Sequence, residues 1–490
     1  MERRRPGRSP LVITNWRDSK HPDAGGAEVV CERLAQSFVE RGFDVVLLVA
    51  AVKGESRNDQ VNGYRVVRRG NRFTVYPWAL LWILVHRRRI RAVIDSQNGI
   101  PFFTPVAVNR RTPVLMLLHH IHQDQFSLLF SPLMTRVGKW LEKRGSSIVY
   151  RNRSIVAVSP STRTGARGRL GLKGDIVTVS PGCESAVTSF GGRRGRSESP
   201  RIVCVGRLVP HKRTALIVRS MPGLLDEFPQ LELHLVGDGS ERPAIEALVD
   251  ELDLRTHVVV HGEISDAERD QLLRTAWMSI NVSEGEGWGL SVVEANTFGV
   301  PVLAYRRPGL RDSIRDGETG WLIEDEEELG PAVLRALALL SDDAVADAMG
   351  NRARQWASLF SWDGMASQIL SLIRAEEGRL AHLSDNRRLS TDLSTVARVP
   401  VDVLPVGLDP KFRYTDKAVM TDDHLVVLLR NTDTDTAVLA LHRAGIPSAM
   451  LTGSGTRLSV ATTVDLISPA LSASAQPDAE DQSVPDELAG

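Results

Sequence analysis

The chain has 490 residues, of which 42% are apolar and 24% charged, so it is expected to fold into two large domains with a smaller addition. Its three cysteines, Cys31, Cys183 and Cys204, lie far apart and in no metal-ligand spacing, which argues against a disulfide framework and a cysteine zinc site. The 60 basic and 60 acidic residues balance, but residues 1–190 hold about 30 Lys and Arg against about 14 Asp and Glu.

We expect neither a signal peptide nor a membrane span. The basic start leads into an apolar run of only four residues, 11–14, and the longest apolar stretch, Trp78 to Val85, is too short to cross a bilayer. The few cysteines favour a reduced, cytoplasmic location. The basic N-terminal half could attract anionic lipid at the inner face of the membrane, nucleic acid or phosphorylated acceptors, or it could be a merely solvated surface.

Apolar β-type runs alternate with helical patterns over the first third of the chain, which predicts a parallel sheet covered by helices on both faces. A helix is expected near 26–41, with Gly42 just past its end. Strands are expected at 11–14, 45–50, 92–95, 114–119 and 155–159.

The same alternation restarts after a stretch rich in Gly, Ser and Arg, which is typical of a linker. Strands are expected at 202–208, 231–239, 257–263, 277–284 and 301–305, and a helix near 364–375. Two doubly wound α/β domains in tandem leave a cleft between the carboxyl ends of their strands, where such sheets bind ligands.

The most informative motif is a glycine-rich loop that opens a helix. Gly285, Gly287 and Gly289 precede this helix, so free backbone N–H groups at its positive end form an anion site. Glu286 and Glu294 are eight positions apart, about two helical turns, so both carboxylates can face one ligand. Carboxylates accept strong hydrogen bonds from pairs of hydroxyl groups, which suits a sugar ligand.

Two further segments place cations and glycines at strand ends. Arg207 and Lys212 follow an apolar strand, where two cations would neutralise a diphosphate leaving group. Gly25 and Gly26 open the first helix and permit close approach of a phosphate to the backbone. Glu28 either takes part in this site or is only a first-turn residue favoured by the helix dipole.

Together these segments resemble glycosyltransferase family 4, the retaining GT-B enzymes, over about residues 10–375. The resemblance rests on the Glu-x7-Glu spacing, the Gly-Val-Pro-Val-Leu strand and Asp-Gly-Glu-Thr-Gly-Trp-Leu turn that follow it, and the Gly-Arg-Leu…Lys motif. It implies a GT-B fold, two Rossmann-like domains facing a central cleft. It also implies that Glu286 contacts donor-sugar hydroxyls, that Glu294 binds the nucleotide ribose, and that Arg207 and Lys212 hold the pyrophosphate.

Three histidines, His119, His120 and His122, stand at the end of another apolar strand. A zinc site is one interpretation, but no nearby cysteine or His-Glu-x-x-His pattern supports it. The family resemblance implies a histidine at this strand end, near the donor sugar and the acceptor. His120 is the first choice and His119 the second, because the sequence does not tell which ring faces the cleft.

These assignments define a candidate site on both sides of the predicted cleft. The predicted catalytic residues are His120, His119 and Glu286. The predicted donor-binding residues are Gly25, Gly26, Arg207, Lys212, Glu263, Ile264, Glu286, Gly287, Trp288, Gly289, Leu290 and Glu294. The backbone around Glu263 and Ile264 is expected near the nucleotide base, whose identity the sequence does not give.

A basic helix is predicted within 134–153, with Val137, Trp140 and Leu141 on one face. It could contact a membrane or a polyanionic acceptor. Buried packing of the apolar face, with the basic face exposed, is the interpretation that we prefer.

We therefore predict a retaining glycosyltransferase that moves a sugar from a nucleotide-diphosphate sugar to an unidentified lipid, glycan or small molecule. A nucleotide-sugar epimerase of the same fold and an inactive sugar-nucleotide-binding protein are the alternatives. No cofactor and no nucleic-acid partner are expected. The resemblance also argues against a required metal, because Arg207 and Lys212 supply the positive charge. The pair Asp433 and Asp435 begins a predicted helix, where N-capping explains it better than a metal does.

The predicted organisation has six parts. They are an N-terminal Rossmann-like acceptor domain at 1–187, a linker at 188–200, a C-terminal Rossmann-like nucleotide-sugar domain at 201–360, a closing helix at 361–375, a small α/β extension of unknown role at 376–468 and a disordered acidic tail at 469–490. Short strands are expected at 401–408, 424–430 and 448–453 of the extension, around a helical segment at 437–445.

Overall fold

The computed structural model of the chain describes most of its length. The described residues are 9–184, 195–324, 329–381, 393–404, 412, 416–430, 432, 434–446 and 457–462. The predicted acidic tail at 469–490, the first half of the predicted linker and the predicted strand at 448–453 lie outside these residues.

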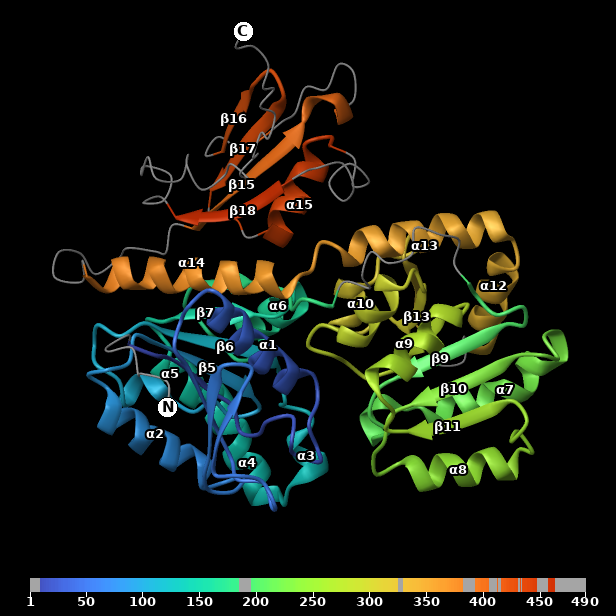
Figure 1. Cartoon of the computed structure of the whole chain (residues 1–490), viewed down its shortest axis with the longest axis horizontal. Helices are drawn as coiled ribbons and strands as arrows, with labels where there is room; N and C mark the ends of the chain where they lie inside the picture. The colour runs from blue at the N-terminus through green and yellow to red at the C-terminus, as the bar shows by residue number, and fades with distance from the viewer. Residues whose placement is uncertain are drawn as a thin grey trace, which may run out of the picture.

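An eight-stranded sheet occupies the N-terminal third of the chain (Figure 1), in the order β3-β4-β2-β1-β5-β6-β7-β8. The five predicted strands are β1 (Leu11–Thr14), β2 (Val45–Val49), β5 (Ala92–Asn98), β6 (Val114–His120) and β7 (Ser154–Ala157). The sheet also contains β3 (Asn58–Val61), β4 (Tyr64–Arg68) and β8 (Ile176–Thr178). All neighbouring strands are parallel except β3 and β4, which form an antiparallel hairpin at the edge.

Two parallel three-stranded sheets follow, in the orders β11-β10-β9 and β12-β13-β14. Their strands are β9 (Arg201–Val205), β10 (Glu232–Val236), β11 (Val258–Gly262), β12 (Ser279–Asn281), β13 (Val302–Tyr305) and β14 (Gly320–Ile323). A bridge between Ile202 and Met278 joins the two sheets. Both halves are therefore parallel α/β units, as their alternating apolar runs predict.

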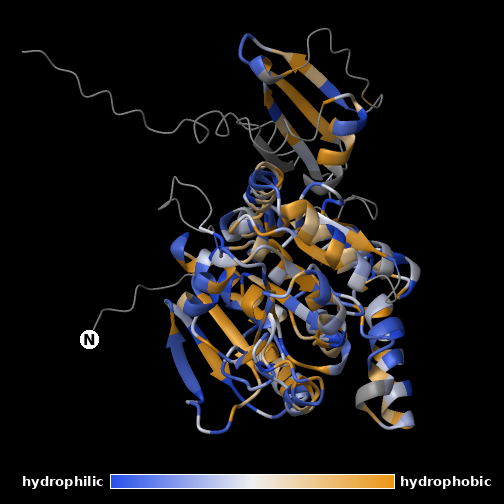
Figure 2. Ribbon diagram, turned by 90° about the vertical axis from the view of Figure 1, so that its right-hand side faces the viewer, coloured by the Kyte–Doolittle hydropathy of each residue, from blue (hydrophilic) through white to orange (hydrophobic). Residues whose placement is uncertain are grey.

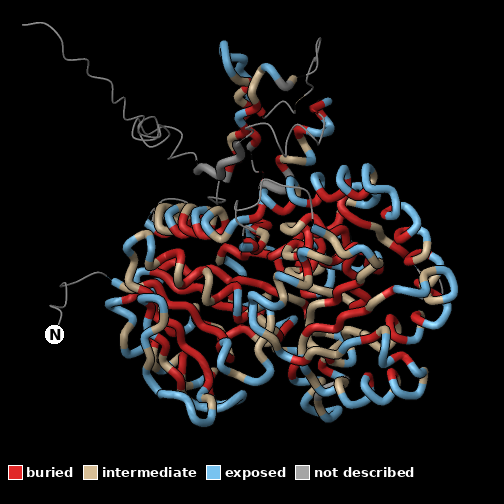
Figure 3. The backbone as a smooth tube through the Cα atoms, turned by 45° about the vertical axis from the view of Figure 1, so that its right-hand side comes forward, coloured by how far each residue is buried: buried red, intermediate tan, exposed pale blue. Residues whose placement is uncertain are grey.

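Helices cover these three sheets, most of whose strands are orange, and so apolar, in Figure 2 and red, and so buried, in Figure 3. The helices of the first half are α1 (Gly26–Glu40), α2 (Val75–His86), α3 (Phe126–Leu129), α4 (Pro132–Trp140), α5 (Ser146–Val149) and α6 (Pro160–Gly168). Those of the second half are α7 (Ala215–Glu227), α8 (Arg242–Glu251), α9 (Asp266–Thr275), α10 (Leu290–Thr297), α11 (Leu310–Ser313), α12 (Leu329–Leu340) and α13 (Asp343–Ala357).

Helix α14 (Trp362–Ala381) crosses back from the second half to the first and is longer than the predicted helix at 361–375. Its Met365 and Ile369 share a buried cluster with Leu34 and Phe38 of α1. Near its end, the fully buried carboxylate of Glu376 forms an ion pair with Arg379 at 2.5 Å. The helix therefore fastens the chain to the first sheet after the second sheet is complete.

The predicted basic helix is not one regular helix. It comprises α4, a π-helical turn (Leu141–Gly145) and α5. The side chains of Val137 and Trp140 are 50% and 56% exposed, so the prediction that they are buried is wrong. The reason is that the buried residue of α4 is Gly138, which packs closely against Phe126, so the apolar stripe faces outward.

An antiparallel sheet with the order β16-β17-β15-β18 follows α14 and carries one helix, α15 (Thr434–Arg443). Its strands are β15 (Leu393–Pro400), β16 (Lys417–Met420), β17 (His424–Arg430) and β18 (Arg457–Thr462). The predicted strand at 401–408 is wrong at its start, because 401–403 form a 3-10 turn after β15. The predicted N-cap Asp433 lies outside the described residues.

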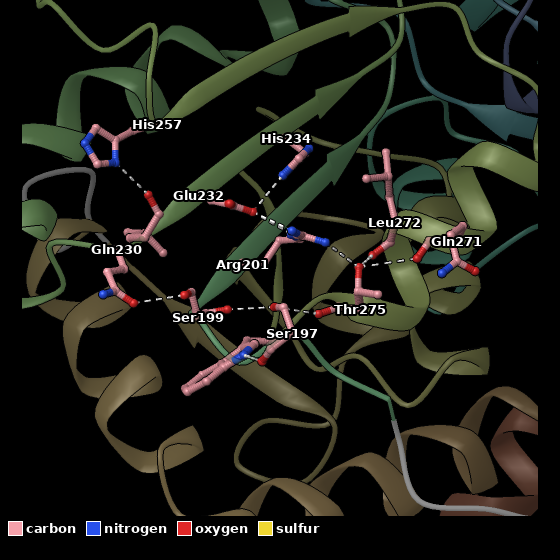
Figure 4. Close-up of polar contacts among 12 residues, drawn as sticks. Ser197, Ser199, Arg201, Gln230, Glu232, His234, His257, Gln271, Leu272 and Thr275 are labelled. Atoms are coloured by element: carbon pink, nitrogen blue, oxygen red, sulfur yellow. Dashed lines mark hydrogen bonds and ion pairs between the residues drawn. The ribbon is translucent and has the colours of Figure 1, made fainter.

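The segment that enters β9 is held by a set of polar contacts at the amino ends of the strands (Figure 4). Arg201 forms an ion pair with Glu232 of β10 and donates to Thr275 of α9. Ser197 donates to the backbone of Thr275, and the indole of Trp277 donates to the Ser197 carbonyl. The described end of the predicted linker, from residue 195, is therefore fixed to the second sheet.

Candidate active site

Glycines pack against one another at the carboxyl ends of β9, β10 and β11. A Cβ atom on Gly237 would lie 2.2 Å from the carbonyl oxygen of Gly206, and the φ of Gly237 is +129°. The N–H of Gly237 in turn donates to the carbonyl of Gly262. Only glycine allows this approach and this backbone conformation. The loop residues that follow, among them Arg207 and Glu263, therefore start from one edge of the sheet.

Lys212 and Glu286 form an ion pair at this edge. Lys212 ends a 3-10 turn (Pro210–Lys212) after β9, and Glu286 lies in the glycine-rich loop after β12. The N–H of Glu284 donates to the carbonyl of His211, which ties the loop to the turn. Burial raises the pKa of the Glu286 carboxyl, but the Lys212 ammonium more than offsets this, so the net pKa is lowered and the carboxylate is charged.

A pocket lies beside this pair. Its lining residues are Cys204, Val205, Gly206, Arg207, Leu208, Lys212, Thr214, Ile217, Ile280, Asn281, Val282 and Ser283. Two of them, Arg207 and Lys212, are cationic, and none is acidic. A pocket with this charge suits an anionic ligand.

The structure separates the two candidate histidines. A Cβ atom on Gly285 would lie 3.9 Å from Cε1 of His120, and the charge of Glu286 counters the burial that lowers the pKa of the His120 ring. His119 instead is 6% exposed, and its Nε2 lies 2.9 Å from Oγ of Ser96 inside the first unit. The ring of His120 therefore faces the Glu286 loop, whereas the ring of His119 is directed into the first unit.

The glycine-rich loop contacts the first unit directly. A Cβ atom on Gly287 would lie 2.0 Å from the carbonyl oxygen of His119, and the hydroxyl of Thr162 donates to the Gly287 carbonyl at 3.2 Å. A Cβ atom on Gly26 would lie 3.0 Å from the side chain of Leu290, the first residue of α10. Loops from the two units therefore meet at the site.

The expected free amide at Gly25 is already bound. The N–H of Gly25 donates to the carboxylate of Glu28 at 2.7 Å, and Asn15 donates to the same carboxylate at 3.2 Å. Glu28 therefore binds the first turn of its own helix, which favours the interpretation of Glu28 as a first-turn residue, and the roles of Gly25 and Gly26 in donor binding stay predictions. Gly25 still lies beside Arg207, whose Nη1 donates to the carbonyl of Asp23 at 3.1 Å.

Trp288 was predicted to bind the donor, but the structure buries its side chain. Its ring lies 4.9 Å from that of Phe360 and belongs to the same core cluster as residues of α14, so only its backbone is left for the predicted contact with the donor. Gly289, with a φ of +89°, is the N-cap of α10, where a Cβ atom would lie 2.9 Å from Oγ of Ser313. These two residues shape the loop rather than line the pocket.

Three more predicted residues, Glu294, Glu263 and Ile264, come from α10 and from the loop after β11. Glu294 is half-buried on α10, and burial raises the pKa of its carboxyl, with Arg269 lowering it in part. Glu263 is exposed and Ile264 half-buried in the loop after β11. Among the described residues, no hydrogen bond connects these three side chains to the pair, and their roles stay predictions.

Sequence reasoning missed Glu142, which holds the loop that follows His120. Its carboxylate accepts the N–H of His122 at 2.7 Å and the side-chain amide of Gln123. Glu142 lies in the π-helical turn, and such turns are frequent at functional sites. No spacing in the sequence connects Glu142 with the histidine loop.

Two family models match consecutive parts of the chain. Residues 24–186 match the model described as Glycosyltransferase Family 4, and residues 192–356 match Glycosyl transferases group 1. The chain belongs to glycosyltransferase family 4. The predicted family and the predicted α/β fold of GT-B type are therefore confirmed, and this chain is an enzyme of the glycosyltransferase class.

Curated relatives of this glycosyltransferase are transferases too. A GDP-mannose-dependent alpha-(1-6)-phosphatidylinositol monomannoside mannosyltransferase from Mycolicibacterium smegmatis is 28% identical over 419 residues, which cover 77% of this chain and 98% of the relative. A D-inositol 3-phosphate glycosyltransferase from Streptomyces avermitilis is 32% identical over 33% of this chain and 37% of its own length.

Solved structures share the fold at low sequence identity. A sucrose-phosphate synthase from Thermosynechococcus elongatus has a TM-score of 0.62 and 21% identity, and covers 75% of this chain and 98% of its own. WaaG, a glycosyltransferase involved in lipopolysaccharide biosynthesis, has a TM-score of 0.58 and 16% identity, with 74% and 99% covered.

Proposed function

We propose that this glycosyltransferase moves a sugar from a nucleoside-diphosphate sugar onto its acceptor with retention of anomeric configuration. The observation that carries the proposal is the Lys212–Glu286 pair, held beside His120 and the cationic pocket of Arg207. Cations stabilise the charge that develops on a leaving diphosphate. A carboxylate that stays charged accepts hydrogen bonds from sugar hydroxyls.

The proposed reaction is a front-side displacement. The bond between the anomeric carbon and the diphosphate oxygen breaks while the acceptor hydroxyl adds on the same face, and the leaving phosphate oxygen takes the hydroxyl proton. Arg207 and Lys212 neutralise the leaving group, and Glu286 orients the sugar. Burial keeps the His120 ring neutral, so it hydrogen-bonds near the sugar without adding charge.

A GDP-linked mannose is the first donor to test. The relative that spans 77% of this chain is named for GDP-mannose and for a phosphatidylinositol mannoside, and a second is named for inositol 3-phosphate. These names support a phosphorylated inositol, free or lipid-linked, as the acceptor class of this chain. UDP- and ADP-linked sugars are the alternatives for the donor.

The test is a donor-hydrolysis screen over UDP-, GDP- and ADP-sugars. We expect one nucleotide class to be hydrolysed, and Glu286→Ala to slow that hydrolysis by about 100-fold, the scale at which one charge-stabilising group acts. Glu284→Ala, two residues away and exposed, is the matched control and should keep its rate. Interconversion of epimeric donors without any acceptor would instead favour the epimerase alternative, and hydrolysis of none would contradict the proposal.

We also propose that no metal takes part in this transfer. The support is that Arg207 and Lys212 already place two positive charges at the pocket where a divalent cation would otherwise act. Hydrolysis in the screen should therefore keep its rate after EDTA treatment. A rate that falls with EDTA and recovers with added Mg²⁺ or Mn²⁺ would contradict this part of the proposal.

A second proposal concerns an outer face of the first unit. No helix in the described part of the chain has the length and hydropathy to cross a bilayer. Helices α2, α4 and α5 with the 3-10 turn (Thr104–Val106) nevertheless expose large apolar side chains, which we call the apolar-basic face. Its exposed apolar residues are Leu81, Leu84, Val85, Val106, Leu133, Val137, Trp140 and Ile148.

The elements of this face adjoin one another and carry exposed cations. A Cβ atom on Gly145 would lie 3.0 Å from the ring of Phe103, which leads into the 3-10 turn packed beside α2. The exposed cations are Arg87, Arg88, Arg89, Arg110, Arg111, Arg136, Lys143 and Arg144. Apolar side chains among cations fit the interface of an anionic bilayer.

Vesicle co-sedimentation tests this contact. We expect the protein to bind vesicles that contain about 30 mol% phosphatidylserine. Binding to vesicles of phosphatidylcholine alone, or to either kind at high salt, should be weaker. The double variant Val137→Ser and Trp140→Ser should bind about tenfold less, since two half-exposed apolar groups lose their insertion. Leu339→Ser, equally exposed on α12, is the control. Equal binding by the variant and the wild type would contradict the proposal.

A further inference from the structure

Arg17 is a buried cation whose hydrogen-bonding capacity is largely unused. Its side chain is 9% exposed and stacks on the ring of Trp16 at 4.3 Å. Nε lies 3.0 Å from the carboxylate of Glu28 but off the hydrogen-bond axis, and it makes no hydrogen bond. Among the described residues, Nη1 and Nη2 donate to no partner. The enclosed Nε is costly to leave without a partner, while Nη1 and Nη2 are not fully enclosed and can reach a ligand.

Glu28 does not require Arg17 to be satisfied. It accepts hydrogen bonds from Asn15 and from the N–H of Gly25, the N-cap residue of α1. The ion pair therefore positions the Arg17 guanidinium more than it saturates it. The remaining N–H donors of Arg17 can therefore bind a ligand that enters from outside the first unit.

Arg17 and Arg207, the cation of the opposite unit, both lie beside the contact between Gly25 and Glu28. Gly25, which Glu28 binds, would place a Cβ atom 3.4 Å from Nε of Arg207. Burial lowers the pKa of the Arg207 guanidinium, and the like charge of Arg17 lowers it further. Arg17 also lowers the pKa of His122, after burial and the His120 ring, so its charge reaches the histidine loop as well.

Two partly buried guanidinium groups that repel each other form a site for a doubly charged anion. Arginine binds phosphate through its planar, forked donors, and low local polarity strengthens that contact. We propose that Arg17 binds a phosphate group in the cleft together with Arg207. This inference rests on the proposed function only for the source of the phosphate, which is the donor diphosphate or a phosphate of the acceptor.

The test measures binding of phosphates by calorimetric titration of the full chain. One arm uses GDP, UDP and ADP for the donor diphosphate, and the other adds inorganic phosphate or inositol 1-phosphate to protein saturated with the nucleotide. We expect Arg17→Gln to weaken one arm by 10- to 100-fold, about what a charged hydrogen bond contributes. Arg219→Gln, an exposed arginine of α7 that does not line the pocket, is the control for net charge and should bind like the wild type.

Arg17→Lys separates binding from folding. It retains a charge for Glu28 but lacks the fork, so we expect wild-type thermal stability and weakened phosphate binding. If Arg17→Gln and Arg17→Lys bind every phosphate within twofold of the wild type, the inference is wrong. If the wild type binds no nucleotide but binds phosphate, and Arg17→Gln weakens that binding, the proposed function fails and the inference holds. If the wild type binds no phosphate compound at all, both fail.

Discussion

Glu142 combines complete burial with a position behind the histidine loop. Burial raises the pKa of its carboxyl to about 7, although the N–H of His122 and the amide of Gln123 counter that effect. The folded state therefore binds a proton at Glu142 at pH values where the unfolded chain has lost it. A raised carboxyl pKa means that stability is lost as pH rises from about 4.5 through about 7.

The prediction at this residue is a pH dependence of stability. Ionising Glu142 in the folded state should lower the free energy of unfolding by about 2.5 kcal/mol between pH 5 and pH 8, from the shift in pKa. Glu142→Gln should remove this part of the dependence, because the amide has no proton to lose. Urea unfolding of both proteins at the two pH values measures it. An unchanged pH dependence in the variant would contradict the assignment.

At the scale of residues, the sequence predicted the site residues that lie in short motifs and missed those that only tertiary contacts bring to the site. The glycine spacing and the cations after β9 identified the loops of Lys212 and Glu286, which the structure joins in one ion pair. The sequence could not choose between His119 and His120. Adjacent side chains of a strand point to opposite faces of the sheet, and the sequence does not tell which face borders the cleft. Arg17 and Glu142 act through partners far away in sequence, so no local pattern marks them.

At the scale of elements, α14 depends on one buried carboxylate. Glu376 is fully buried and lies near Arg379 and Arg153 as well as the hydroxyl of Ser154. The adjacent Glu377 forms an exposed ion pair with Arg91. Two neighbouring glutamates on one helix thus differ mainly in burial.

Their substitution should separate buried from exposed charge pairs. Glu376→Ala leaves two arginines without their buried partner and should destabilise the protein by about 3 kcal/mol, whereas Glu377→Ala should cost less than about 1 kcal/mol. Chemical denaturation of both variants measures the difference. Equal destabilisation would mean that α14 is not held by Glu376.

The loop between β12 and α10 sets the second prediction at this scale. A Cβ atom on Gly287 would lie 2.0 Å from a backbone oxygen of the first unit, so Gly287→Ala must displace the loop that carries Glu286. We expect donor hydrolysis to fall at least tenfold, because small displacements of positioning groups cost rate. Gly223→Ala, where the added atom meets nothing within 4 Å, is the control. A rate unchanged in Gly287→Ala would show that the loop tolerates the shift.

Element prediction failed where strands are short or polar. β3 reads Asn-Asp-Gln-Val and alternates between exposed and half-buried residues at the sheet edge, so it lacks the apolar run of the central strands. The turn after β3, Asn62-Gly63, has positive φ at both residues, and an Asn-Gly pair of this kind is a sequence signal for a hairpin. The π-helical turn that follows Trp140 has no sequence signature.

At the scale of the whole molecule, the proposed site forms where loops from the two α/β units meet. Two separate alternations of strands and helices predicted the two parallel units, but not their contacts, since these join residues more than a hundred positions apart. Arg207 reaches the backbone of Asp23, and Thr162 reaches Gly287. Tertiary packing, above all of α14 on α1, decides that these loops face each other.

The most direct measurement of the central claim is calorimetric titration of the full chain with GDP, UDP and ADP, in the wild type and in Lys212→Ala. We predict that one nucleotide binds the wild type, and that Lys212→Ala weakens it at least tenfold, because Glu286 loses its counter-charge and the diphosphate loses a cation. Lys173→Ala, an exposed lysine of the first unit, should bind as the wild type does. Binding that is the same in Lys212→Ala and Lys173→Ala would contradict the account.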